Sequence, residues 1–274
     1  MSQHKVYSAK TTVNGVNLYY ERHGIGKGKP LVFIAGFTCD HHYWDSMVAA
    51  LAADHELLLL DNRGMGQSDS TDDEYDIALM ADDVMALLAE LGIALPVIIG
   101  QSMGSLIAQT IGKRYADRID RLVLINTATR VQTAPLLAFE LTGELQRNGQ
   151  VTLEAIVQSI VPWIYSSAFL SVPGQLENLF ALARENPYPP SLQTYYQQLT
   201  ALKAFDSEAW LYELSMPALV IAAAEDIICP PLAGQVVADA MGDKAQFVLV
   251  PGGHASPIEQ PGVLVEVIGE FVAE

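Results

Sequence analysis

The feature that most constrains the fold is a series of short, wholly apolar runs separated by stretches whose apolar residues have helical spacing. Wholly apolar runs of this length are typical of strands buried on both faces, as in a parallel sheet covered by helices. Because helical stretches alternate with the runs, the sequence predicts an α/β domain with a mostly parallel central sheet. The runs are Leu31–Ile34, Leu57–Leu60, Val97–Ile99, Leu122–Ile125, Ala218–Ala222 and Phe247–Val250.

Two local patterns add detail to this outline. Asp76–Leu91 carries its apolar residues at intervals of three and four, which predicts a helix. Near the beginning of the chain, strands are predicted over Lys5–Val13 and Val16–Glu21, with a turn at Asn14-Gly15. Asn-Gly is the commonest pair in tight hairpins, since both central residues need positive φ.

The stretch from about Thr129 to Glu208 breaks the alternation, because it contains helix-like segments with Pro and Gly breaks and no convincing strand. It is too long for an ordinary loop, so we expect an inserted helical subdomain. Ligands of open α/β sheets bind beyond the carboxyl ends of strands, where such an insertion would lie as a lid. We therefore expect a core of residues 1–128 and 209–274 and a helical cap of residues 129–208.

The charge balance excludes two classes of partner. Lys and Arg number 15 and Asp and Glu number 32, so the formal net charge is −17. Nucleic-acid binding needs a basic surface that displaces counterions from phosphate, and an anionic membrane would repel this chain for the same reason. The excess of acid is typical of a well-solvated surface.

The cysteines and the apolar segments indicate the compartment. The two cysteines, Cys39 and Cys229, form no disulfide framework and no metal-ligand spacing, which is compatible with a reducing environment. The first residues contain no apolar stretch of the kind found in signal peptides, and the longest apolar runs are far too short to cross a bilayer. We expect a cytoplasmic protein without a metal site.

The segment Gly100-Gln101-Ser102-Met103-Gly104 carries the clearest chemical signal. It follows an apolar run and precedes a helical stretch, which is the strand–turn–helix setting of a nucleophile elbow. The sharp turn places the serine in strained backbone geometry, and a Cβ two residues away on either side would collide with neighbouring elements. Ser102 is therefore the candidate nucleophile.

A serine hydroxyl needs a base to take its proton, and the base needs an acid that holds its tautomer. Among the six histidines, His254 lies in a glycine-rich loop directly after the last predicted strand, where it can reach Ser102. Asp226 directly follows the strand predicted at Ala218–Ala222, and Glu225 is the rival carboxylate. The order Ser, Asp, His along the chain favours Asp226. Three other histidines are expected at the surface: His4, His23 and His55.

With these residues the chain resembles the α/β-hydrolase fold superfamily over essentially its whole length. The resemblance depends on the elbow, Asp226, His254 and the segment Asp61–Asp69, which is similar to a glycine-containing turn that family members carry after an early strand. It implies the α/β-hydrolase fold, a helical cap at Thr129–Glu208, and chemistry that needs no metal or organic cofactor.

The resemblance also implies an oxyanion hole formed by the backbone N–H groups of Phe37 and Met103. Family members usually read His-Gly in that loop, whereas this chain reads Ala35-Gly36, and we expect that His41 or His42 substitutes for the missing brace. The surrounding sequence is also similar to a signalling branch that retains the triad but acts as regulator or receptor. That branch is the alternative to an enzyme.

A serine at the elbow leaves esters, lactones, thioesters, amides and carbon–carbon bonds as the bonds cleaved, and the aromatic residues of the cap indicate an uncharged pocket. We expect a serine esterase or lactonase of carboxylesterase type that acts on a small molecule. A 3-oxoadipate enol-lactonase would need a cation in the pocket, and a pimeloyl-acyl-carrier-protein methyl ester esterase would need a basic cap. Basic residues of the predicted cap are outnumbered by acidic ones, so a carrier protein is an improbable partner. The basic residues are Arg130, Arg147, Arg184 and Lys203.

Overall fold

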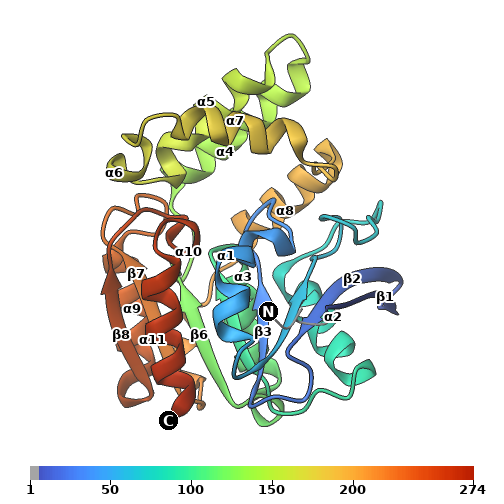
Figure 1. The fold of residues 1–274 in the computed structure, drawn as a ribbon, viewed down its shortest axis with the longest axis vertical. Coiled ribbons are helices and arrows are strands. Elements are labelled where there is room, and N and C mark those ends of the chain that lie inside the picture. Colours follow the sequence, from blue (N-terminus) through green and yellow to red (C-terminus); the bar gives the residue numbers. More distant parts are fainter. Residues whose placement is uncertain (1–5) are drawn as a thin grey trace.

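The computed structural model describes residues 6–274, which form one eight-stranded sheet in the order β1-β2-β4-β3-β5-β6-β7-β8. β1 and β2 form an antiparallel hairpin, β2 is antiparallel to β4, and all later neighbours are parallel (Figure 1). The strands are β1 (Tyr7–Val13), β2 (Val16–His23), β3 (Pro30–Ile34), β4 (Glu56–Leu60), β5 (Val97–Gln101), β6 (Arg121–Ile125), β7 (Ala218–Ala223) and β8 (Ala245–Val250).

Each wholly apolar run forms a parallel strand, which confirms the fold class predicted from the sequence. One detail of that prediction was wrong. β5, β6 and β7 are buried at every position, but β8 is only partly buried and Leu249 is 54% exposed. The reason is that β8 lies at the edge of the sheet and pairs with β7 alone.

The predicted hairpin and helix both form. Asn14 and Gly15 take φ values of 44° and 82° at the hairpin turn. β1 begins at Tyr7, and Lys5, the first residue of the predicted strand, lies outside the described residues. Helix α2 (Ile77–Glu90) begins after Asp76, whose carboxylate accepts a hydrogen bond from the Leu79 N–H at 2.8 Å. This is the usual way in which a side chain satisfies an orphan N–H at a helix start.

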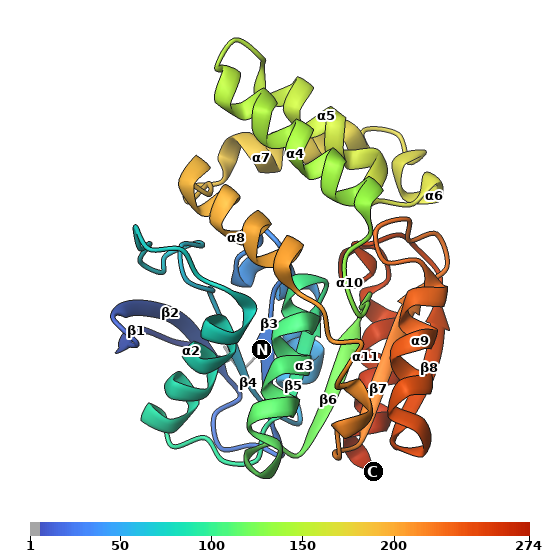
Figure 2. The same cartoon turned by 180° about the vertical axis from the view of Figure 1, so that it is seen from behind.

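Helices cover both faces of the sheet, and consecutive strand residues pack in opposite directions (Figure 2). In β3, Val32 and Ile34 join the core beneath α2, α3 (Met103–Arg114) and α9 (Pro231–Met241), whereas Leu31 and Phe33 join the core beneath α1 (Asp45–Leu51) and α11 (Pro261–Ala273). Within residues 6–274, no helix has both the length and the apolar content that a bilayer crossing needs. Short helices complete the core: η1 (His41–Trp44), η2 (Ala116–Arg118), η3 (Leu211–Glu213), η4 (Gly242–Lys244) and α10 (Ser256–Glu259).

Five α-helices lie between β6 and β7 along the chain, and in Figures 1 and 2 they sit at one end of the sheet. We call them the cap helices. They face the carboxyl ends of the parallel strands, because their side chains and Ser102, which follows β5, line the same cavity. The cap helices are α4 (Thr133–Asn148), α5 (Leu153–Ile164), α6 (Ser167–Leu170), α7 (Gln175–Glu185) and α8 (Leu192–Ala204).

Candidate active site

Ser102 lies at the sharp turn between β5 and α3, with φ 52° and ψ −120°. A non-glycine residue in this region stores backbone strain, which only a tightly determined surrounding can hold. The two glycines that flank Ser102 show how closely the neighbouring backbone packs around this turn. A Cβ on Gly100 would lie 2.1 Å from the carbonyl oxygen of Gly104, and a Cβ on Gly104 would lie 2.0 Å from that of Ile34. Only glycine fits at both positions.

The structure brings together Ser102, His254 and Asp226, which follow three different strands. The Ser102 hydroxyl lies 2.8 Å from Nε2 of His254, and Nδ1 of the same ring lies 2.8 Å from Oδ2 of Asp226. His254 and Asp226 are 5% and 2% exposed, so water barely competes for these bonds. The rival carboxylate Glu225 is exposed and accepts a hydrogen bond from the Ser167 N–H at 3.3 Å instead.

The second oxygen of Asp226 is occupied by the backbone. Oδ1 accepts hydrogen bonds from the N–H groups of Ile228 at 2.8 Å and Cys229 at 2.9 Å. These donors fix the carboxylate so that Oδ2 faces the imidazole. A ring that donates from Nδ1 to a carboxylate carries its lone pair on Nε2, which is the atom that faces Ser102. The arrangement is able to withdraw a proton from the hydroxyl.

Two amide side chains hold the backbone of His254, and the sequence analysis did not identify them for this role. Gln101 Nε2 donates to the His254 carbonyl at 2.8 Å, and Asn126 Nδ2 donates to the same oxygen at 2.7 Å. Both residues follow or end parallel strands at the edge where the site lies. Their position at the ends of adjacent predicted strands is the sequence feature from which this role could have been predicted.

The loop around His254 is also bonded to the cap helices. Glu259 accepts hydrogen bonds from the N–H groups of Gly253 at 3.0 Å and Ser166 at 3.1 Å, and from the Ser166 hydroxyl. The Ala255 N–H donates to the Ile164 carbonyl at 3.0 Å. The sequence contains no signal for these contacts, because the partners are far apart along the chain. They join the α5–α6 connection to the loop that carries His254.

The expected oxyanion donors lie beside Ser102. Met103 is the first residue of α3, so its N–H has no partner within the helix. The Phe37 loop passes close by, since a Cβ on Gly36 would lie 3.2 Å from the Cβ of Ser102. Within the described part of the chain, neither the Phe37 nor the Met103 N–H donates to a backbone carbonyl. Both N–H groups are thus without a backbone acceptor, as the donors of an oxyanion hole have to be.

His41 is buried behind this loop and bonds to the turn after β4. Its Nδ1 lies 2.7 Å from Oδ1 of Asp61, which also accepts the His41 N–H at 2.8 Å. Burial lowers the pKa of His41, but the hydrogen bond and charge of Asp61, with the charge of Glu21, outweigh it and raise the pKa above its usual value. His41 therefore braces η1, whereas His42 is exposed and pairs with Asp45.

The expectation that His23 lies at the surface was wrong. His23 ends β2 opposite Leu57 of β4, is 7% exposed, and lies 3.0 Å from a Glu21 carboxylate oxygen. The position is covered because β2 is an interior strand of the sheet. His55 is partly buried, and His4 lies outside the described residues.

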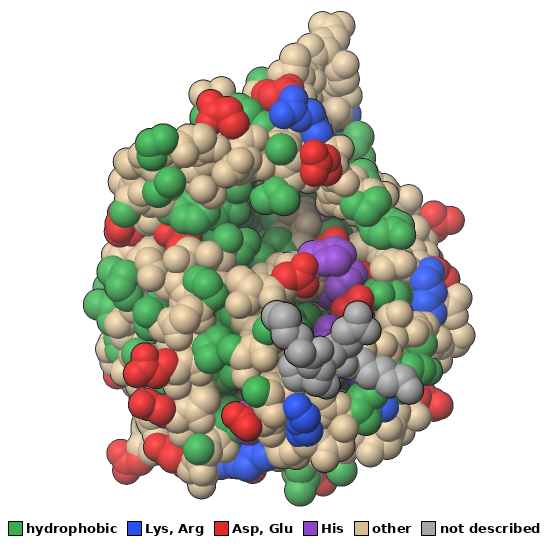
Figure 3. Space-filling view, viewed as in Figure 1, with side chains coloured by type: hydrophobic (Ala, Val, Ile, Leu, Met, Phe, Trp, Pro, Cys, Tyr) green, Lys and Arg blue, Asp and Glu red, His purple; other side chains and the backbone are tan. Residues whose placement is uncertain are grey.

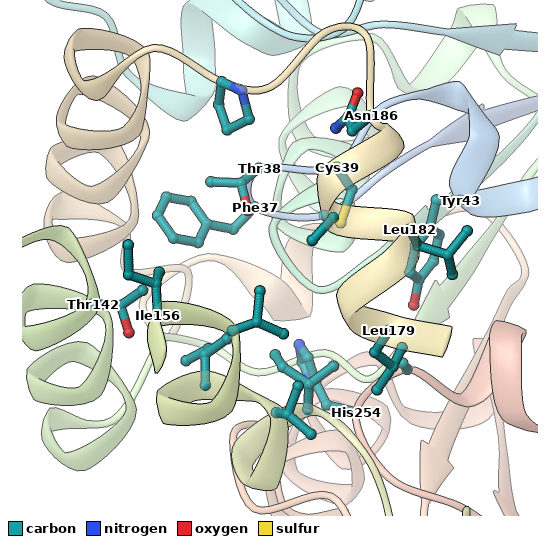
Figure 4. A pocket seen from close by; sticks show the side chains of 18 of the residues that line it. Phe37, Thr38, Cys39, Tyr43, Thr142, Ile156, Leu179, Leu182, Asn186 and His254 are labelled. Atoms are coloured by element: carbon teal, nitrogen blue, oxygen red, sulfur yellow. The ribbon is translucent and has the colours of Figure 1, made fainter. Parts of the chain in front are cut away.

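A cavity of about 500 Å³ opens between the cap helices and the core, with Ser102 and His254 in its wall. Figure 3 shows a hollow there with hydrophobic side chains around it, and Figure 4 shows the lining from close by. The lining includes the aromatic residues Phe37, Phe139 and Tyr195, and Cys39, whose pKa burial raises to about 12. Among the described residues that line it, none is Lys, Arg, Asp or Glu.

The basic side chains of the cap segment lie outside this lining and pair with acidic neighbours. Arg130 lies 3.0 Å from Asp206, Arg147 3.1 Å from Glu144, Arg184 3.3 Å from Glu154, and Lys203 contacts Glu140. Within residues 6–274, no three His, Cys, Asp or Glu side chains gather closely enough to hold a metal ion. The cavity therefore presents an apolar wall and the Ser–His–Asp arrangement.

Comparisons with known proteins agree with this fold. Residues 29–261 match the model of the alpha/beta hydrolase fold family. A relative from Pseudomonas savastanoi, named carbamate hydrolase RutD, is 29% identical over 84% of this chain and 88% of its own length. A relative of the same name from Variovorax paradoxus is 27% identical over 93% of this chain and 96% of its own length.

Two solved structures are similar along nearly the whole chain. The enol-lactonase from Burkholderia xenovorans LB400 has a TM-score of 0.87 and 26% identity, covering 97% of this chain and 100% of that one. A thermophilic esterase from Thermogutta terrifontis has a TM-score of 0.81 and 27% identity, covering 97% and 98%. The chain belongs to the α/β hydrolase fold family and is a hydrolase.

Proposed function

We propose that the chain is a serine hydrolase that cleaves a small carboxylic ester or lactone through an acyl-enzyme. The observation that carries the proposal is the continuous hydrogen-bond relay from Ser102 through His254 to Asp226, at the wall of an uncharged cavity. Such a relay activates a hydroxyl that is otherwise a weak nucleophile.

In the proposed mechanism, Ser102 Oγ attacks the substrate carbonyl while His254 Nε2 takes the hydroxyl proton. The carbonyl oxygen becomes an oxyanion, which the N–H groups of Phe37 and Met103 stabilise. His254 then returns the proton to the leaving alkoxide, which gives an alcohol and an acyl-enzyme. The alcohol departs if the substrate is an ester and stays attached to the acyl chain if it is a lactone. Water repeats the sequence with the same base, and the acid product leaves. Asp226 holds the imidazole orientation throughout.

The lining favours a neutral substrate. The enol-lactonase of Burkholderia and the RutD relatives act, by their names, on a lactone and a carbamate. A dicarboxylate-like lactone would call for a cation in the cavity, and the described lining residues supply none. We therefore rank a neutral ester or lactone above an anionic one. The acidic partners of the cap's basic residues also argue against an acidic carrier protein.

The proposed division of the chain is a core of residues 1–128 and 209–274, with a cap of residues 129–208 that acts as a lid. The cap helices supply most of the apolar wall of the cavity, from α4, α5 and α7. A lid of this kind would exclude water from the acyl-enzyme. No cofactor is needed in this proposal, because the triad and the two N–H donors complete the chemistry.

Two measurements test the proposed function. A fluorophosphonate probe should label Ser102, located by peptide mass, and a series of p-nitrophenyl esters and simple lactones should be turned over many times per chain. Ser102→Ala should abolish both, whereas Ser8→Ala, an exposed serine of β1, should change neither. Labelling elsewhere on folded protein would refute the assignment. Release of one product molecule per chain with no further turnover would instead favour a regulator or receptor that retains the triad.

A further inference from the structure

The loop that carries the Phe37 N–H is a strained turn. The Cys39 N–H donates to the Gly36 carbonyl at 3.2 Å, which closes a turn over residues 36–39. Of its two central residues, Phe37 and Thr38, only Thr38 has a positive φ, at 58°. This is the pattern of a type II turn, which usually has glycine at that position. A β-branched residue there is strained, and it persists only if its surroundings hold it.

A side chain of the cap helices holds this turn. The Thr38 N–H donates to Oε1 of Gln198, in α8, at 2.9 Å. Gln198 is 0% exposed, so water does not compete for the bond. In the relaxed alternative, a type I turn, the peptide between the two central residues is flipped. The Thr38 N–H would then point away from Gln198, so the acceptor selects the strained form.

The cap helices also hold the side chain of Phe37. Its ring centroid lies 4.9 Å from that of Tyr195, at an interplanar angle of 64°, and 5.1 Å from that of Phe139 in α4. Tyr195 precedes Gln198 by three residues, so both side chains leave the same face of α8. The Tyr195 hydroxyl donates to the Phe139 carbonyl at 2.7 Å, which joins the two helices. The cap helices therefore contact both central residues of the turn.

We propose that Gln198 is a positioning residue for the oxyanion hole: by accepting the Thr38 N–H, it keeps the turn in the form that directs the Phe37 N–H to the oxyanion beside Ser102. This inference rests on the proposed function. A donor that is in place before the oxyanion forms needs no reorganisation during the reaction. Without the Gln198 oxygen, Thr38 can relax and the turn moves, so the Phe37 N–H is no longer held in place. The cap helices thus help to assemble the oxyanion hole as well as covering the cavity.

The test is Gln198→Met, which removes the acceptor and nearly preserves the volume of the side chain. The folded variant should have a kcat for p-nitrophenyl butyrate about tenfold below wild type with KM within twofold, because the lost interaction exists only in the transition state. This loss is smaller than the factor of about 10²–10³ for a deleted donor, since the N–H is displaced and not removed. Phenylboronic acid, whose tetrahedral adduct with Ser102 resembles the intermediate, should bind about tenfold more weakly.

Gln197→Met is the matched control, because it makes the same change one residue away on α8. Gln197 Nε2 donates to the carbonyls of Thr71 and Asp73, each at 2.9 Å, so this variant loses bonds of the fold and none to the turn. It should lower the Tm and leave kcat within twofold of wild type. If Gln198 had only a structural role, Gln198→Met would show the same pattern.

Thr38→Gly tests whether the strained turn is the link. Glycine takes a positive φ without strain, so the turn no longer depends on Gln198. The kcat penalty of Gln198→Met should therefore shrink from about tenfold to less than threefold when it is measured in the Thr38→Gly background. Gln198→Asn, which withdraws the oxygen by one CH₂, should show the same loss as Gln198→Met and takes its place if that variant does not fold.

Three results would each overturn the inference: a kcat within twofold of wild type in folded Gln198→Met, an equal loss of kcat in Gln197→Met, or the same Gln198→Met penalty with and without Thr38→Gly. Each of them leaves Ser102-dependent turnover in the wild-type protein intact. Failure of the proposed function is distinguishable, because wild type would then show no turnover that Ser102→Ala removes.

Discussion

Asp226→Asn should nearly abolish turnover while the fold persists, and the structure shows why. Oδ1 of Asp226 accepts two backbone N–H bonds, at 2.8 and 2.9 Å, from Ile228 and Cys229. An amide NH₂ cannot take that place, because it would face two donors. The carbonyl oxygen of the asparagine must occupy the Oδ1 site, and its NH₂ must face Nδ1 of His254. The imidazole then accepts at Nδ1 and carries its proton on Nε2, where it cannot accept from Ser102.

The expected size follows from the loss of the base. Replacing this carboxylate with an amide in serine-triad enzymes lowers kcat by about 10⁴, which corresponds to about 5 kcal/mol in the barrier. The free energy of unfolding should fall by only about 1–2 kcal/mol, since the two backbone bonds survive and the bond to Nδ1 re-forms in the opposite direction without the carboxylate charge. Steady-state kinetics on a p-nitrophenyl ester and urea unfolding measure the two quantities separately.

Glu225→Gln is the matched control, because it makes the same chemical change one residue away on an exposed side chain. Its kcat should stay within about threefold of wild type. The reasoning is refuted if Asp226→Asn retains kcat within tenfold of wild type while folded, or if Glu225→Gln is the more damaged of the two. Either result would mean that Asp226 does not set the tautomer of His254.

Three further predictions concern the surroundings of the triad. Gly104→Ala should lower the free energy of unfolding in urea by more than about 2 kcal/mol, because its Cβ would overlap a backbone oxygen, whereas Gly269→Ala on α11, which meets nothing, should be neutral or stabilising. Glu259→Ala should lower kcat about tenfold in steady-state assays, since the N–H groups of Gly253 and Ser166 would lose their shared acceptor; an unchanged kcat would show that the cap contact does not position the base. The raised pKa of His41 means that its charged form stabilises the fold, fully below its unfolded pKa and decreasingly as pH rises through the folded pKa. The stability lost in His41→Gln should therefore be larger at pH 5 than at pH 9 in urea unfolding, and a loss that grows with pH would contradict this sign.

The sequence was sufficient for the parts of the site that depend on local motifs. Ser102 is fixed by a pattern of glycines, and Asp226 and His254 by their places directly after strands, so residue type and chain order indicate them. The fold follows for the same reason, because few folds bury wholly apolar strands on both faces and connect them by helices.

The parts that could not be predicted depend on contacts between distant segments. The bond from Gln101 to the His254 carbonyl spans 153 residues and that from Asn126 spans 128. Glu259 gains its role from Ser166, 93 residues away, and the exposure of β8 depends on which strand ends the sheet.

The position of the cap helices within the chain sets the order in which the protein can acquire activity during synthesis. Ser102 precedes them, whereas Asp226 and His254 follow them. A nascent chain synthesised only as far as the cap helices contains Ser102 but neither the base nor the acid. Because synthesis runs from the N-terminus, the cap helices that supply the apolar cavity wall are made before Asp226 and His254. In the proposed mechanism, Ser102 can therefore act as a nucleophile only after β7 has paired with β6 and β8 with β7, which brings Asp226 and His254 to the site.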